Sequence, residues 1–155
     1  MLAAALEASA LGAWMRGSNW AYPVANLVHL AGLILLIGNL LLLDLRLLGA
    51  GRQFPLPALS SVLTPLAIVG LVLLLASGVL LFAADATPLL ANDLMQLKLL
   101  LIALGVVNAL VFRRLHDHRL EAWDQDPPIA GRVQAFLSIA CWLIAGTLGR
   151  LIAYA

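Results

Sequence analysis

The chain has 155 residues, which is the length of a single domain. Hydrophobic residues make up 63% of it and charged residues 11%, whereas soluble domains are about 45–50% apolar and about 25% charged. These proportions exclude a soluble globular enzyme and a disordered chain. Nine Lys and Arg residues against eight Asp and Glu residues leave no basic excess for nucleic acid. The single Cys141 excludes an internal disulfide framework and a cysteine-based zinc site. The class that remains is an integral protein of a lipid bilayer.

The first 20 residues differ from the rest of the chain. They are only moderately apolar, contain Glu7 and Arg16, and lack the basic start and compact apolar core of a cleaved signal peptide. Trp14 and Trp20 are of a residue type that favours the membrane–water interface. We therefore expect residues 1–20 to form a short amphipathic helix on the membrane surface. A frayed tail is the alternative.

Four later segments are long and apolar enough to cross a membrane, which takes about 20 residues in a helix. The predicted spans cover about residues 22–48, 58–84, 92–115 and 131–154, within one membrane domain over residues 21–155. Their runs are rich in Leu and Ala and do not alternate as barrel strands do. Because a helix satisfies its own backbone in lipid, we predict an all-α fold, a four-helix transmembrane bundle.

Arginine residues gather in and beside the loops that follow the first and third predicted spans. These residues are Arg46, Arg52, Arg113, Arg114, Arg119 and Arg132. The opposite side of the membrane carries three basic residues, namely Arg16, Lys98 and Arg150. The positive-inside rule then places the arginine-rich loops in the cytoplasm. We expect a multi-pass protein of the bacterial inner membrane with both termini in the periplasm.

Ionisable and polar residues inside spans are rare, and they usually face the bundle interior. Four of them share an arc of about 140° on the first span: Asn26, His29, Asn39 and Asp44. One side of this helix is therefore expected to meet protein or a cofactor, and the other side lipid.

The polar residues separate into two layers by depth. At about 1.5 Å per residue, His29 and Lys98 lie roughly 10 Å inside the outer face of the bilayer. Arg150 lies near that face, and Asn26 completes the outer layer. Because this layer holds basic groups and no carboxylate, an anionic or carbonyl-bearing cofactor would fit, either haem b through its propionates or a quinone. Asp85 and Asp93 of the outer loop or a lipid phosphate are other candidate partners for these cations. Alternatively, Lys98 and Arg150 extend outward to water. The inner layer consists of Asn39, Asp44 and Asn108, with Arg46 nearby.

His29 is the most specific single feature, because imidazole is the usual axial ligand of haem b in helix bundles. Gly32 would let a flat macrocycle approach the backbone. No second histidine lies within a predicted span, so a bis-histidine haem would need His29 from two subunits, or Met95 as the other ligand. The alternatives are a quinone-binding or proton-transferring role, other metal ligation, and a structural histidine hydrogen-bonded to Asn26 or to another helix.

A second histidine pattern occurs in the loop after the third span. His116 and His118 flank Asp117, and neutral imidazoles at this spacing could bind a divalent metal. The surrounding stretch mixes arginine with acidic residues. A solvated continuation of the third helix, with ion pairs three or four residues apart, explains the pattern equally well.

The run NLVHLAGLILLIGNLLLLDLRLLG, residues 26–49, resembles the first span of an uncharacterised bacterial family of small four-helix membrane proteins. Residues 63–82 and 97–112 are similar to its second and third spans. The matching positions are His29, Asp44, Leu45, Arg46, Gly49, Pro65, Gly78, Lys98, Asn108 and Phe112. The family is distantly similar to copper-resistance D-type proteins and cytochrome b561-like bundles, which implies haem or copper handling. The several histidines of those cytochromes are missing here.

The sequence leaves three functions open and contains no recognisable catalytic constellation. The first is an electron-transfer module that holds haem b or a quinone through His29, Lys98, Arg150 and Asn26. The second is a non-catalytic subunit that packs on a larger respiratory or periplasmic complex. The third is a metal or small-solute transporter that acts as a dimer, since a homo-oligomer would double the number of spans.

Overall fold

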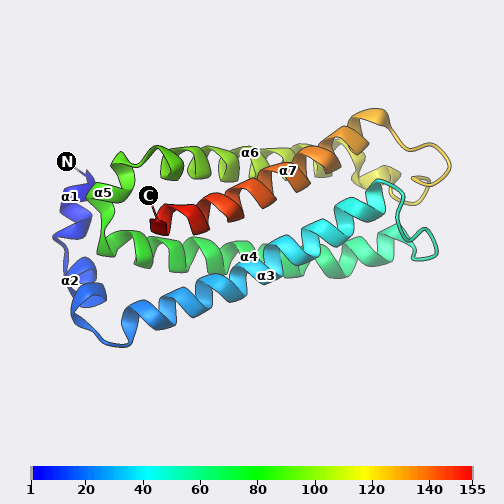
Figure 1. The fold of residues 1–155 in the computed structure, drawn as a ribbon. Coiled ribbons are helices and arrows are strands. Elements are labelled where there is room, and N and C mark those ends of the chain that lie inside the picture. The colour runs from blue at the N-terminus through cyan, green and yellow to red at the C-terminus, as the bar shows by residue number, and fades with distance from the viewer. Residues whose placement is uncertain (1, 155) are drawn as a thin grey trace.

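The computed structural model describes residues 2–154 and consists of helices joined by turns, with no strand in that range. Four helices are long and apolar enough to cross a membrane (Figure 1). They are α3 (Ala21–Leu47), α4 (Leu56–Ala84), α6 (Asp93–His116) and α7 (Ile129–Leu151). Their ends lie within three residues of the expected positions. The predicted four-helix architecture is confirmed, and the four apolar helices indicate a bilayer environment for a multi-pass protein.

Short helices lie across one end of the four long ones, which we call the N-terminal end (Figure 1). They are α1 (Leu2–Glu7), α2 (Ala10–Gly17) and α5 (Ala86–Ala91). The loops 48–55 and 117–128 lie at the opposite end, which we call the arginine-rich end. The predicted amphipathic helix is thus two helices separated at Ser9, whose hydroxyl accepts a hydrogen bond from the Gly12 N–H at the start of α2.

The amphipathic helix α2 packs its apolar side against the ends of the long helices. Met15 is buried against Ala21, Ala25 and Ala84, while Trp14 on the other side is exposed. The indole of Trp14 is therefore free to lie at the membrane interface, as the residue type favours. The N-terminal segment covers the end of the bundle in addition to presenting an aromatic surface.

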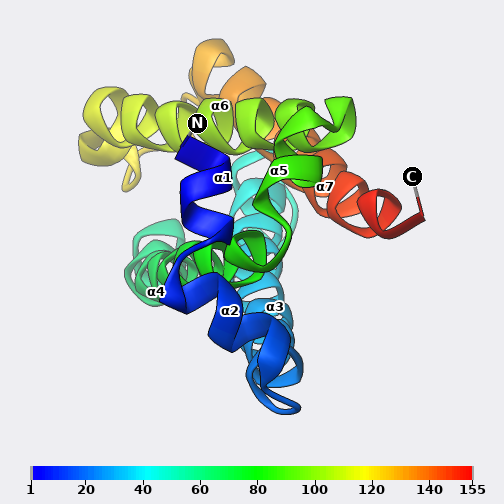
Figure 2. The same ribbon diagram turned by 90° about the vertical axis from the view of Figure 1, so that its left-hand side faces the viewer.

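The long helices form two pairs, α3 with α4 and α6 with α7, and α3 crosses α7 to join the pairs. Within residues 2–154, α4 and α6 do not pack along each other, and Figure 2 shows them apart when viewed from the N-terminal end. The closest approach of α3 and α4 is at Gly32 and Gly70. A Cβ on Gly32 would lie 2.9 Å from the Gly70 carbonyl oxygen. Small residues permit such contacts between membrane helices. Gly32 thus adjoins the backbone of α4, and not the space for a macrocycle that we expected.

The docking of α1 on α5 depends on one carboxylate. Glu7 Oε2 accepts a hydrogen bond of 2.9 Å from the backbone N–H of Thr87, and the Arg16 guanidinium donates to the carbonyl oxygens of Glu7 and Ala84. Hydrogen bonding by Thr87 holds the pKa of Glu7 below its ordinary value. Because the folded-state pKa is depressed, this stabilisation is complete at neutral pH and is lost as the pH falls through the lowered value.

We expect α1 to detach from α5 in acid before the long helices unfold. Hydrogen exchange at the Thr87 amide, corrected for the intrinsic effect of pH, should then accelerate as the pH falls below the ordinary range of a carboxyl group. A Glu7→Gln variant should lack this acceleration, because it has no carboxyl to titrate. Equal protection of the Thr87 amide across that pH range in the native chain would contradict the assignment.

Candidate functional site

His29 of α3 is held from one side by Ser77 of α4. The imidazole Nδ1 lies 2.9 Å from Ser77 Oγ, and the Ser77 hydroxyl donates its hydrogen to the Leu73 carbonyl oxygen at 2.5 Å. A hydroxyl has only one hydrogen, so Ser77 Oγ accepts from His29 Nδ1–H. In the neutral imidazole this bond fixes the tautomer and leaves the lone pair on Nε2.

The Nε2 atom of His29 is open to a ligand. It forms no hydrogen bond to residues 2–154, and it is not fully enclosed by them. Gly78 makes room for the ring, because a Cβ at this position would lie 3.5 Å from imidazole Cε1. A histidine whose other nitrogen is fixed by a hydrogen bond has the arrangement found in metal-ligating and acceptor imidazoles.

Lys98 of α6 approaches the same layer from the other helix pair. Its side chain is half-buried and lies against Gly149 of α7, where an added Cβ would be 3.1 Å from Lys98 Nζ. His29 lies eight residues into α3 and Lys98 five residues into α6, and both helices begin at the N-terminal end. No carboxylate among the described residues lies within ion-pair distance of Lys98. A cation and an imidazole lone pair therefore share the outer layer, one from each helix pair.

The other two residues of the predicted outer layer lie elsewhere. Arg150 is exposed; its guanidinium donates to the Tyr154 hydroxyl at 2.6 Å and lies 5.0 Å from the centre of that ring. Asn26 is on an exposed face of α3 and has no side-chain hydrogen bond to the described residues. The structure thus brings His29 together with Lys98, and leaves Arg150 and Asn26 outside this group.

Of the expected partners of His29, the structure has another helix in place of Asn26, and sequence reasoning did not single out Ser77 as the residue on that helix. The available signal was a Ser–Gly pair in an otherwise apolar helix, because small and polar residues mark helix contacts in membranes. Gly149 could have been noted in the same way, since it lies beside Arg150 in the last turns of α7.

The predicted inner layer is a set of separate contacts. Asn39 donates to the Leu35 carbonyl oxygen of its own helix at 2.6 Å. Asn108 of α6 donates to the Gln134 carbonyl oxygen of α7 at 2.9 Å and so joins these two helices. Asp44 is buried where α3 crosses α7, with Ser138 beside its carboxyl group.

At the arginine-rich end, the 117–128 segment is fastened to the end of α3. The buried Arg46 guanidinium donates to both carboxylate oxygens of Asp124, at 2.9 and 2.5 Å, and to the Phe54 carbonyl oxygen. The bond from Arg46 holds the pKa of Asp124 below its ordinary value. Beside this pair, Trp123 Nε1–H donates to the Leu47 carbonyl oxygen at 2.9 Å.

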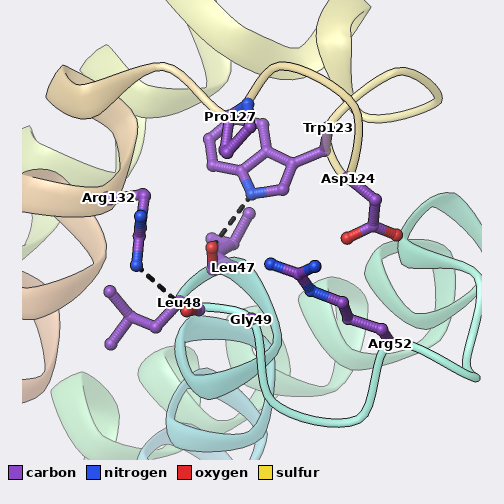
Figure 3. A pocket seen from close by; sticks show the side chains of 8 residues that line it. All are labelled: Leu47, Leu48, Gly49, Arg52, Trp123, Asp124, Pro127 and Arg132. Atoms are coloured by element: carbon purple, nitrogen blue, oxygen red, sulfur yellow. Dashed lines mark hydrogen bonds between the residues drawn. The ribbon is translucent and has the colours of Figure 1, made fainter.

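Figure 3 shows a shallow pocket over these contacts, in which Arg52 and Arg132 lie on opposite sides of the end of α3. Its lining residues are Leu47, Leu48, Gly49, Arg52, Trp123, Asp124, Pro127 and Arg132. The anchoring bonds run from the loop and from α7 to carbonyl oxygens at the end of α3, which a helix leaves without internal partners. We therefore interpret this region as structural.

The two histidines of the H-x-H pattern point into different environments. His116 is buried, with its ring centre 5.2 Å from that of Phe112 and 5.9 Å from that of Trp123, whereas His118 is exposed. Across residues 2–154 no three His, Cys, Asp or Glu side chains gather as a metal site. The predicted helical continuation is short: α6 ends at His116, with an ion pair between Arg113 and Asp117.

No large pocket surrounds His29 in the part of the chain that the structure describes. A site that encloses a sizeable organic ligand has a volume of about 300–1,000 Å³. Two small cavities in residues 2–154 have about 10 Å³ each, and His29 lines neither of them. The chain also offers no second histidine in this layer.

Comparison of the chain with family models, curated proteins and solved structures found no match. The resemblance of residues 26–49 to a four-helix bacterial family stays a prediction.

Proposed function

We propose that this is a small integral membrane protein that holds a quinone headgroup between its two helix pairs. The observation that carries the proposal is the accessible His29 Nε2, fixed by Ser77 and accompanied by Lys98 from the other pair. The six arginines of the arginine-rich end favour a cytoplasmic location for that end. The quinone layer then lies in the periplasmic half of a bacterial inner membrane, and both termini are periplasmic.

The two side chains suit both redox forms of the ligand. The Lys98 ammonium donates hydrogen bonds and accepts none, so it binds a carbonyl oxygen of the oxidised form. His29 Nε2 accepts a hydrogen bond from a hydroxyl of the reduced form, while Nδ1–H stays bonded to Ser77. A bound quinone supplies a carrier for two electrons and two protons. The protein would thereby serve as an electron-transfer module or as the quinone-binding subunit of a larger complex.

We expect quinone to co-purify with the native protein and to depend on the two residues that the structure brings together. The protein would be isolated in native lipid particles, and its quinone content compared with that of the same lipids without protein. His29→Phe and Lys98→Met should each weaken binding. Loss of a hydrogen bond to a charged group costs about 1.5–3 kcal/mol, so Lys98→Met should lose roughly tenfold to hundredfold in affinity. Loss of the neutral bond costs about 0.5–1.5 kcal/mol, so His29→Phe should lose up to about tenfold.

Arg150→Gln is the matched control, because it removes a basic residue of the same span region that lies outside the His29–Lys98 group. It should retain quinone at the native level. Quinone at the lipid background in the native protein would contradict the proposal, as would equal loss in all three variants. Iron in the preparation together with a haem absorption band that disappears in His29→Phe would replace quinone by haem.

A further inference from the structure

Two arginines that line the pocket at the arginine-rich end keep most of their hydrogen-bond donors free. Arg52 forms no hydrogen bond and no ion pair with residues 2–154 through its guanidinium. Arg132 forms a single long bond to that range, 3.4 Å from Nη2 to the Leu48 carbonyl oxygen. Both side chains are exposed. Because a guanidinium has several N–H donors and no acceptor, each of the two can bind a further acceptor.

The loop after α3 is folded so that Arg52 lies back over the end of that helix. Gly49 and Gly51 have positive φ angles of 109° and 61°, which side chains other than glycine rarely adopt. Farther along the loop, the Arg46 guanidinium donates to the Phe54 carbonyl oxygen. As a result, Arg52 Nη2 lies 3.5 Å from the position that a Cβ on Gly49 would take. The backbone that carries Arg52 is therefore fixed by the bonds and turns of its neighbours.

Arg132, in the first turn of α7, approaches the same point from the other side (Figure 3). Its guanidinium bonds to Leu48, and that of Arg52 lies beside Gly49. The two free cations thus flank successive residues at the end of α3. One ligand with several acceptor oxygens can bind both of them.

The charge at this pocket favours an anion. Asp124 is the only carboxylate among the described residues that line it, and the buried Arg46 bonds to both of its oxygens. Arg52 and Arg132 therefore add positive charge to a pair that is already neutral. The planar guanidinium group is suited to phosphate, because its N–H groups match two phosphate oxygens at once.

Apolar side chains place the pocket at the edge of the bilayer. Ile129 and Val133 lie near Arg132 in the sequence of α7, and both are exposed. Phe54, two residues after Arg52, is also exposed. Large apolar side chains of this kind are stable in lipid, whereas arginines at the ends of spans extend to the headgroup region. The two free arginines therefore lie at the depth of the lipid phosphates.

We propose that this pocket binds the phosphate group of an anionic phospholipid, whose oxygens accept hydrogen bonds from both Arg52 and Arg132. Basic pockets at the ends of membrane helices bind acidic headgroups in this way. Arg52 follows α3, which belongs to one helix pair, and Arg132 belongs to α7 of the other pair. The lipid therefore joins the two pairs at the arginine-rich end, in addition to the bonds that the 117–128 segment makes.

The test is thermal unfolding in detergent with increasing amounts of phosphatidylglycerol, compared with phosphatidylcholine of the same chains. A ligand that binds the folded state raises the melting temperature, and the half-saturating lipid content gives the affinity. We expect phosphatidylglycerol to stabilise the native protein more than phosphatidylcholine does. Arg52→Gln and Arg132→Gln should each weaken this response by about tenfold in affinity, because each removes a charged hydrogen-bond donor.

Arg114→Gln is the matched control, because Arg114 is an exposed arginine of the same end that does not line the pocket. It should respond to phosphatidylglycerol as the native protein does. All three variants should unfold at the native temperature without added lipid, since the side chains of Arg52 and Arg132 are exposed and contribute one long bond. Equal responses to the two lipids, or an equal loss of response in all three variants, would overturn the proposal.

Inorganic phosphate distinguishes a lipid headgroup from a soluble anion. We expect that an excess of phosphate leaves the effect of phosphatidylglycerol the same as chloride at equal ionic strength does. If phosphate alone stabilises the native protein and abolishes the effect of the lipid, the pocket is a site for a soluble anion and the lipid proposal is wrong.

Discussion

Gly70→Ala should lower the thermal stability of the protein in detergent and in lipid. A Cβ at this position would lie 2.5 Å from the Leu36 backbone nitrogen and 2.8 Å from the Gly32 carbonyl oxygen. Both are backbone atoms, which cannot turn aside as a flexible side chain would. The clash is therefore relieved only if α3 and α4 move apart along their main contact. Overpacking of this kind costs about 1–3 kcal/mol, and we expect the upper part of that range.

Gly38→Ala is the matched control, since it adds the same methyl group to α3 where no atom of another helix lies within 4 Å. It should leave the melting temperature unchanged or raise it, because alanine has the higher helix propensity. The measurement is thermal unfolding followed by circular dichroism, with both variants in the same detergent. Equal melting of Gly70→Ala and the native protein would show that α3 and α4 are not in close backbone contact.

Trp123→Ala should be the most destabilising substitution outside the membrane spans. The indole is 2% exposed, packs on Phe112 and His116, and donates to the Leu47 carbonyl oxygen. The substitution removes this bond and leaves a cavity at the arginine-rich end. Replacing a buried aromatic side chain by alanine costs about 3–5 kcal/mol. The 117–128 segment should also lose its attachment to α3.

Trp14→Ala separates the effect of burial from the loss of a tryptophan, because Trp14 is 55% exposed. This control should unfold at the native temperature. Limited proteolysis gives the local readout: we expect cleavage within 117–128 to accelerate in Trp123→Ala and to stay at the native rate in Trp14→Ala. If the two variants behave alike in both assays, the 117–128 segment is not anchored by Trp123.

The helices could be predicted from the sequence because their determinants are local. A span needs a run of apolar residues of a certain length, and each of the four runs meets this condition without reference to any other. The ends are local as well, since Pro128 precedes α7 and Gly49 follows α3 with a positive φ of 109°. This explains why the expected and observed ends agree within a few residues.

The candidate site was only partly predictable, because it depends on which helices are neighbours. A helical wheel placed His29 and Asn26 on the same side of the first span. It did not indicate that α4 would cover His29 and leave Asn26 exposed. Depth alone likewise grouped Lys98 with Arg150, whereas the local partner of Arg150 is Tyr154. Gly32 illustrates the same limit: its role at the α3–α4 contact follows from Gly70, which is 38 residues away in the sequence.

His116 shows how a motif can mislead when burial is unknown. The H-x-H spacing predicts two ligands on one surface, but α6 ends at His116 and the chain turns there. One ring then joins the aromatic cluster with Phe112 and Trp123, and the other faces outward. The signal that separates these outcomes is Trp123, because a tryptophan in a polar loop brings a large apolar surface that is stabilised by burial.

Nitrogen NMR of the His29 imidazole during titration with a short-chain quinol tests the quinone site most directly. In the free protein we expect Nδ1 to carry the hydrogen and Nε2 to be unprotonated, as the bond to Ser77 dictates. Quinol should shift the Nε2 resonance and leave Nδ1 nearly unchanged, with a weaker response in Lys98→Met. A His29 signal that does not respond, or a hydrogen on Nε2 in the free protein, would contradict the account.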